Sequence, residues 1–176
     1  MAMLKSGRNK LSLMIRAELC RIDFRCVIAG ALIVLACGIL SALAAGPTVA
    51  YYELVKPRFA PPRFLFPTAW TILYLLIGGA AGAVACVKER ALESEKYKGM
   101  LFFIIQMIFN FIWSPLFFGA GAYFAAFAAI VMMIIFTVLT YLNFRRILRV
   151  AGWAMLVYLA WLIFAAYLNL AIVILN

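Results

Sequence analysis

Three groups of aromatic and amide side chains recur at helical spacing, and their types are those that bind small molecules. The groups are Pro67, Trp70 and Tyr74; Gln106, Asn110, Trp113 and Phe117; and Tyr158, Trp161, Ala165 and Asn169. Residues three and four positions apart lie on one face of a helix, so each group forms a continuous stripe. A pocket walled by aromatic rings with a few amides suits a flat, apolar, polycyclic ligand.

Acid–base and metal chemistry are poorly supported by the remaining residues. The sequence has no histidine, which removes the commonest general base and haem ligand. Its six acidic residues all lie in tails or connections: Glu18, Asp23, Glu53, Glu89, Glu93 and Glu95. No carboxylate pair, nucleophile–base pair or metal cluster can be assembled from the apolar segments. This pattern argues against a hydrolase and against a proton-coupled transporter.

The four cysteines show no C-x-x-C spacing. They are Cys20, Cys26, Cys37 and Cys86, and three of them are expected in or beside a bilayer. The sequence therefore indicates neither a disulfide framework nor a zinc site.

Four long uncharged runs place these stripes in a membrane. Residues 26–52, 64–87, 99–144 and 150–176 contain no charged side chain, and mean hydropathy is +1.10. About 20 apolar residues span a bilayer, so the 46-residue run from 99 to 144 is long enough for two helices. We expect an all-α membrane protein, a bundle of five transmembrane helices at about 26–46, 67–87, 100–118, 122–143 and 151–175. Residues 1–25 are expected to form a basic N-terminal extension, and residues 26–176 a single transmembrane domain.

The basic residues predict how the bundle is oriented. Thirteen of the 16 Lys and Arg residues lie in the N-terminal extension and the second and fourth connections, and three lie in the first connection. The positive-inside rule then predicts a multi-pass protein with its N-terminus inside and its C-terminus outside. We attribute the net charge of +10 to this topology and to contact with anionic membrane lipid, and we expect no nucleic-acid partner.

With this topology the three stripes converge in the outer half of the bundle. The connection 47–66 carries four prolines and is predicted to form a stiff loop above them. Each stripe has a plainer interpretation, because amides also join helices by hydrogen bonds, worth about 0.6–2 kcal/mol. The small residues from Gly78 to Gly82 favour close packing within the chain, and a homodimer through the same face stays open.

Three motifs resemble those of one membrane-protein family. Residues 56–74 read KPRFAPPRFLFPTAWTILY, residues 106–119 carry Q-x-x-x-N-x-x-W with F-F-G, and residues 158–169 read Y-x-x-W-x-x-F-A-x-x-L-N. The chain resembles the translocator protein / tryptophan-rich sensory protein family, also called the TspO/MBR or peripheral benzodiazepine receptor family. It departs from that pattern at Ala50 and Phe59, where the family has tryptophan, and at Val157, where it has proline.

The resemblance implies a membrane receptor or carrier for porphyrins (tetrapyrroles) and other hydrophobic small molecules, acting in their transport or in stress sensing, with no cofactor required. The ligand contacts that it implies are Tyr51, Pro61, Phe66, Trp70, Tyr74, Asn110, Trp113, Ser114, Phe117, Trp161 and Ala165. Two alternatives stay open: oxidative or photo-oxidative degradation of porphyrin, and a structural or partner-binding membrane protein. Both a bacterial membrane and the mitochondrial outer membrane fit the sequence.

Overall fold

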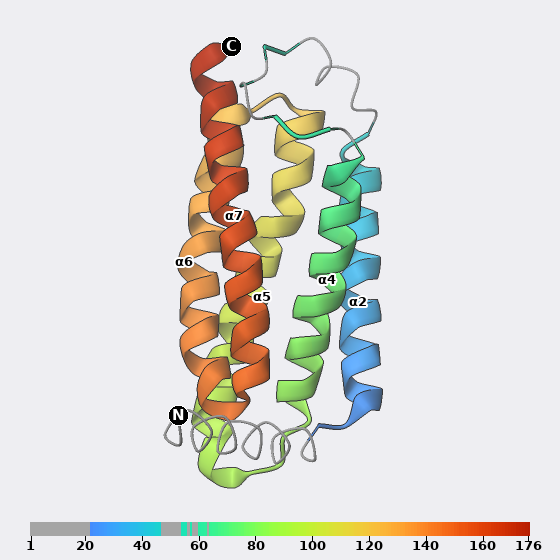
Figure 1. The fold of residues 1–176 in the computed structure, drawn as a ribbon, viewed down its shortest axis with the longest axis vertical. Helices are drawn as coiled ribbons and strands as arrows, with labels where there is room; N and C mark the ends of the chain where they lie inside the picture. Colours follow the sequence, from blue (N-terminus) through green and yellow to red (C-terminus); the bar gives the residue numbers. More distant parts are fainter. Residues whose placement is uncertain (1–21, 47–53, 56, 58–59, 63) are drawn as a thin grey trace, which may run out of the picture.

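The described part of the chain is an elongated bundle of helices (Figure 1). The computed structural model describes residues 22–46, 54–55, 57, 60–62 and 64–176. Within these residues, five helices are long and apolar enough to cross a membrane. They are α2 (Phe24–Ala44), α4 (Leu65–Ala85), α5 (Glu93–Ser114), α6 (Tyr123–Ile147) and α7 (Arg149–Leu175). A short 3₁₀ turn, Arg90–Leu92, precedes α5, and a π-helical turn, Pro115–Gly119, follows it. The all-α, five-helix prediction is confirmed.

The outer surface of the bundle is apolar. Leu43 on α2, Phe124 on α6 and Ile174 on α7 each expose more than 70% of their surface. Soluble proteins rarely expose contiguous patches of this kind, whereas a bilayer solvates them. The protein is therefore a multi-pass integral membrane protein.

The five helices fall into two groups. α6 packs along α5 on one side and along α7 on the other, and α2 packs mainly against α4 (Figure 1). α4 also leans on α7, and α2 makes a smaller contact with α5. The functional pocket described below lies between these two groups.

Glycines bring α2 and α4 into close contact at the end of the bundle where α2 begins. Gly30 of α2 lies against Gly78 and Gly82 of α4, and Gly82 also lies against the backbone carbonyl of Cys26. A Cβ atom at any of these glycines would meet backbone atoms of the neighbouring helix. The small-residue motif thus packs within the chain, as in many membrane helix pairs.

A disulfide between Cys26 and Cys86 joins the same ends of α2 and α4. The prediction that no disulfide is indicated was therefore wrong. The sequence separation of 60 residues hides the pair, and only the antiparallel packing of α2 on α4 brings their Cα atoms to 6.4 Å. Cys37 is a free thiol, and Cys20 lies outside the described residues.

The helix ends differ from the predicted ones in a consistent way. α5 begins at Glu93 rather than near residue 100, because a helix can extend past the bilayer into water, where charged residues are tolerated. Glu93 and Glu95 in its first turn favour that start through the helix dipole. α4 begins at Leu65, which places Pro67 in its first turn rather than at its first residue.

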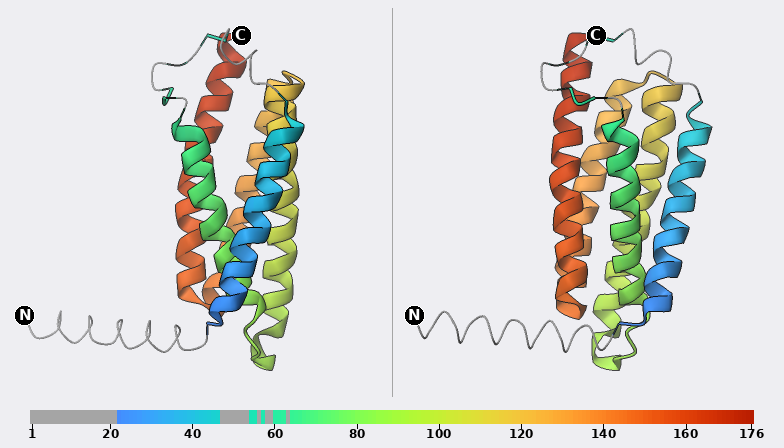
Figure 2. Two further views of the ribbon diagram at one scale, coloured as in Figure 1. Left: turned by 90° about the vertical axis from the view of Figure 1, so that its right-hand side faces the viewer. Right: turned by 45° about the vertical axis from the view of Figure 1, so that its right-hand side comes forward.

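At their other ends α2 and α4 separate (Figure 2). The Ser41 hydroxyl of α2 donates to the Phe111 carbonyl of α5 at 2.6 Å, and Gly119 lies close to the Ala45 backbone. The far end of α2 therefore leans on α5 and away from α4 (Figure 2). The result is a wedge that is closed at the disulfide and open at the opposite end.

Candidate ligand-binding pocket

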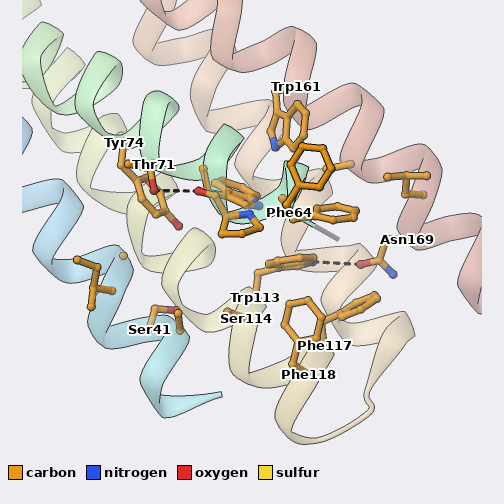
Figure 3. A pocket seen from close by; sticks show the side chains of 18 of the residues that line it. Ser41, Phe64, Thr71, Tyr74, Trp113, Ser114, Phe117, Phe118, Trp161 and Asn169 are labelled. Carbon is orange, nitrogen blue, oxygen red and sulfur yellow. Dashed lines mark hydrogen bonds between the residues drawn. The ribbon is translucent and has the colours of Figure 1, made fainter. Parts of the chain in front are cut away.

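A cavity of about 650 Å³ fills the open end of the wedge (Figure 3). Small-molecule sites in proteins typically measure roughly 300–1,000 Å³. Within the described residues the walls come from α2, α4, α5, the π turn, α7 and the segment before α4. They are Leu35, Gly38, Ile39, Ser41, Ala42, Pro57, Ala60, Phe64, Phe66, Pro67, Trp70, Thr71, Tyr74, Trp113, Ser114, Phe117, Phe118, Trp161, Ala165, Leu168, Asn169 and Ile172. This lining holds no charged side chain.

Trp70 lies at the centre of a cluster of aromatic rings. Its ring centroid lies 5.4 Å from that of Tyr74, 5.9 Å from that of Trp113 and 6.3 Å from that of Trp161. The contact with Trp161 is edge-to-face, and the other two are tilted. Such contacts are favourable beyond simple burial, so the cluster forms a stiff aromatic wall.

The π turn brings two further rings to this wall. Trp113 stacks on Phe117 with centroids 5.2 Å apart, and Phe118 meets both rings edge-on. Pro115 lacks a backbone donor, and the Ala120 N–H donates back to its carbonyl in the wider π pattern. π turns of this kind often occur at functional sites. Here the wider turn places Phe117 and Phe118 on the same cavity.

A chain of hydrogen bonds closes the bottom of the pocket. The Tyr74 hydroxyl donates to Asn110 Oδ1 at 2.6 Å, and Asn110 Nδ2 donates to the Tyr158 hydroxyl at 2.5 Å. The Tyr158 hydroxyl in turn lies 3.9 Å from Met133 Sδ. These bonds join α4, α5, α7 and α6, and they fix the depth of the cavity.

A second amide orients the aromatic wall. Trp113 Nε1 donates to Asn169 Oδ1 at 3.1 Å, and Asn169 Nδ2 donates to the Tyr123 carbonyl at 2.9 Å (Figure 3). Asn169 is 2% exposed, so both of its bonds are shielded from solvent. The Trp113 ring is thereby held in a single orientation.

Two buried donors have no acceptor within the described part of the chain. They are Trp161 Nε1, on the pocket wall, and Gln106 Nε2, between α5 and α6. Gln106 also accepts from the Thr137 hydroxyl at 3.4 Å. An unpaired buried donor costs free energy, and the Trp161 indole N–H is therefore available to an acceptor inside the pocket.

The family model of the TspO/MBR family matches residues 30–175 of this sequence. The chain belongs to the TspO/MBR family.

Its relatives come from bacteria, fungi and animals. It is 39% identical over 126 residues to a tryptophan-rich protein TspO of Chlorobaculum tepidum, a match that covers 72% of this chain and 78% of the relative. It is 30% identical over 145 residues to a translocator protein homolog of Schizosaccharomyces pombe, covering 82% and 88%. It is 32% identical over 124 residues to a translocator protein of Ovis aries, covering 68% and 70%.

The structure of this TspO/MBR family member brings together most of the contacts that the sequence predicted. Eight of them line the cavity: Phe66, Trp70, Tyr74, Trp113, Ser114, Phe117, Trp161 and Ala165. Pro61 is described but is not part of the wall, and Tyr51 lies outside the described residues. Asn110 lies beneath the wall, where it holds Tyr74 and Tyr158. Contact of these residues with a ligand stays a prediction.

Sequence reasoning missed the wall that α2 contributes. Leu35, Gly38, Ile39, Ser41 and Ala42 all line the cavity, yet none of them belongs to an aromatic stripe. Gly38 packs against the ring of Tyr74, and Ser41 bonds to α5. Small residues occur along the whole of α2, so its sequence alone did not single out Gly38 and Ser41.

Proposed function

We propose that this protein is a membrane receptor that binds porphyrins and related polycyclic molecules, in their transport or in stress sensing. The observation that carries the proposal is the uncharged, aromatic-walled cavity of about 650 Å³ between α2/α4 and α5/α7. Stacking on the faces of Trp70 and Trp113 would bind a flat ring system without burying a charge. The names of its relatives, translocator protein and tryptophan-rich sensory protein, support a receptor or sensor role.

Polar groups of the ligand would find partners at two places. The Trp161 indole N–H would donate to an acceptor on the ring system. Lys56, Arg58 and Arg63, which lie outside the described residues, would pair with the propionates of a porphyrin at the outer membrane surface. Contact with lipid head groups is the alternative role of these three basic residues.

Titration of the purified protein with metal-free protoporphyrin IX tests the proposal. We expect a micromolar Kd, equivalent to about −8 kcal/mol, measured by quenching of the pocket tryptophans. Absence of saturable binding up to the solubility limit of the porphyrin would contradict the proposal.

The Kd for iron protoporphyrin IX, compared with that for the metal-free ring, shows whether the porphyrin is held by stacking or by coordination of its metal. The lining contains no histidine, cysteine or methionine among the described residues, and the hydroxyl of Tyr74 already donates to Asn110, so the iron should add little affinity. We expect the two Kd values to agree within tenfold. A preference for the iron complex above a hundredfold would show coordination and contradict the stacking account.

The close tryptophans favour a second candidate, photo-oxidative degradation of a bound porphyrin. The rings of Trp70, Trp113 and Trp161 lie within electron-transfer reach of a ligand stacked on them. Light and dioxygen would be the co-reactants. Product analysis after illumination in air, with a dark sample and an oxygen-free sample as controls, separates this activity from binding alone.

We further propose that the pocket end of the bundle faces outward and the disulfide end inward. The connection between α4 and α5, the start of α5, the end of α6 and the start of α7 lie at the disulfide end, and they carry Lys88, Arg90, Lys96, Lys98, Arg145, Arg146 and Arg149. A cysteine placed at Gly7 and one added after Asn176 should react with an impermeant maleimide from opposite faces of sealed vesicles. Reaction from the same face would refute the five-span orientation.

A further inference from the structure

The cavity has a wall that faces the bilayer rather than another helix. On α2, Ile39 and Ala42 both line the cavity and are exposed at the surface of the bundle. On α4, Pro67 and Thr71 do the same. These four residues flank the gap where the two helices separate, and we call this gap the lateral window.

The geometry of α2 explains why the window exists. At one end α2 is held on α4 by the Gly30–Gly78 contact and by the Cys26–Cys86 disulfide. At the other end the Ser41–Phe111 hydrogen bond draws it onto α5. A straight helix that is held on two different partners must separate from the first of them, and Figure 2 shows this separation. The window is therefore built into the fold.

The chemistry of the window rim suits lipid rather than water. Ile39, Ala42 and Pro67 present apolar surface, and the Thr71 hydroxyl is already used, since it donates to the Pro67 carbonyl at 2.8 Å. No charged residue belongs to the rim. A water-soluble solute would lose its hydration on crossing such a rim, whereas a molecule dissolved in acyl chains would not.

The depth of the window points to an amphiphile. Ile39 and Ala42 lie five and two residues before the end of α2, and Pro67 and Thr71 lie two and six residues after the start of α4. At 1.5 Å per residue, the rim lies within roughly 10 Å of the helix ends, near the boundary between acyl chains and head groups. A molecule with an apolar ring and a polar edge partitions to this depth.

We propose that the pocket takes its ligand sideways from the bilayer, through the lateral window between α2 and α4. This proposal rests on the proposed function, because it names the phase from which that same site is filled. The ligand class is a membrane-dissolved, flat amphiphile whose ring enters first between Ile39 and Thr71.

A plug in the window tests the route. Ala42→Phe places a ring at the rim, and Ala36→Phe makes the same change at an exposed position of α2 that does not line the cavity. The measurement is stopped-flow fluorescence of protoporphyrin IX, loaded into vesicles that carry the protein. We expect Ala42→Phe to slow both association and dissociation by at least tenfold, and Ala36→Phe to leave both rates unchanged. A weaker Kd at an unchanged association rate, or equal effects of the two variants, would overturn the proposal.

A second measurement tests the lateral window without porphyrin, so its result does not depend on which ligand the pocket binds. In a Trp153→Phe background, which removes a tryptophan that is 69% exposed, the three remaining tryptophans line the cavity. Phosphatidylcholine brominated near the top of its acyl chains should quench their fluorescence, and Ala42→Phe should relieve at least half of that quenching. Equal quenching in Ala42→Phe and Ala36→Phe would overturn the window even if porphyrin binds. Failure of porphyrin binding with quenching relieved would instead refute the proposed function alone.

Discussion

The two ends of the α2–α4 pair are built from equally apolar helices, yet one end is closed and the other is hollow. At the closed end, glycines allow backbone to touch backbone, and nothing larger than a hydrogen atom fits between Gly30 and Gly78. At the hollow end, the rings of Trp70 and Tyr74 fill the space between α4 and the helices α5 and α7. The difference teaches that side-chain volume, rather than hydropathy, decides where this bundle has a binding site.

The largest effect is expected from a methyl group added at the closed end. In Gly82→Ala the new Cβ meets the backbone carbonyl of Cys26, which cannot move without shifting α2. We expect a loss of about 3 kcal/mol of stability, measured by thermal unfolding in detergent.

Gly79→Ala is the matched control for that substitution. Its new Cβ meets a side-chain atom of Val27 at 3.2 Å rather than backbone. Alanine is also a better helix former than glycine by about 1 kcal/mol, so this variant should be neutral or stabilised. Equal losses in the two variants would mean that the closed end is not held by backbone contact.

Removal of the disulfide should weaken the closed end without altering the hollow end. Cys26→Ser with Cys86→Ser opens a loop of 60 residues. We expect a loss of about 2 kcal/mol, at the low end for disulfides because the membrane keeps the unfolded helices formed. The Kd for protoporphyrin IX should change less than threefold. Cys37→Ser is the control, and a large change in Kd would show that the two ends are coupled.

A substitution at the hollow end should weaken ligand binding without lowering the stability of the fold. Trp161→Ala removes one face of the aromatic wall, and we expect porphyrin binding to weaken by about 1.5 kcal/mol, or roughly tenfold, with the melting temperature little changed. Trp153→Ala removes a tryptophan that faces lipid and should leave Kd unchanged. Similar losses of affinity in both variants would point to general destabilisation and refute the pocket assignment.

The smallest effect is expected at the boundary between the two ends. Tyr74→Phe leaves Asn110 Oδ1 without its donor, which should cost about 1 kcal/mol of stability. Tyr167→Phe, at a half-exposed position on α7, should cost nothing measurable in the same unfolding assay. A neutral Tyr74→Phe would mean that the hydrogen-bond chain does not support the floor of the pocket.

Much of this architecture could be predicted from the sequence, because uncharged length and helical periodicity are local properties. They predicted five spans, and they placed Trp70, Trp113 and Trp161 on converging faces. The contacts that they missed depend on the angle between helices. Cys26 and Cys86, 60 residues apart, meet only because glycines let α2 and α4 touch, and Ile39 lines the pocket only because Ser41 draws α2 onto α5. The angle between α2 and α4 and the angle between α2 and α5 depend on contacts between helices, so neither can be predicted from the sequence of one helix.

In the proposed orientation, the Cys26–Cys86 bond would also make the stability of the fold depend on the redox state of the cytoplasm. It lies at the end of the bundle that carries the basic residues, the end that the positive-inside rule assigns to the cytoplasm. Cytoplasmic thiols are kept reduced by glutathione and thioredoxin. In that orientation the two cysteines would be thiols in a resting cell, and the covalent link between α2 and α4 would form only under oxidation. The fraction of protein with the Cys26–Cys86 disulfide can be measured in cells lysed under acid and thiol-blocking conditions. In that orientation this fraction should rise when the cytoplasm is oxidised.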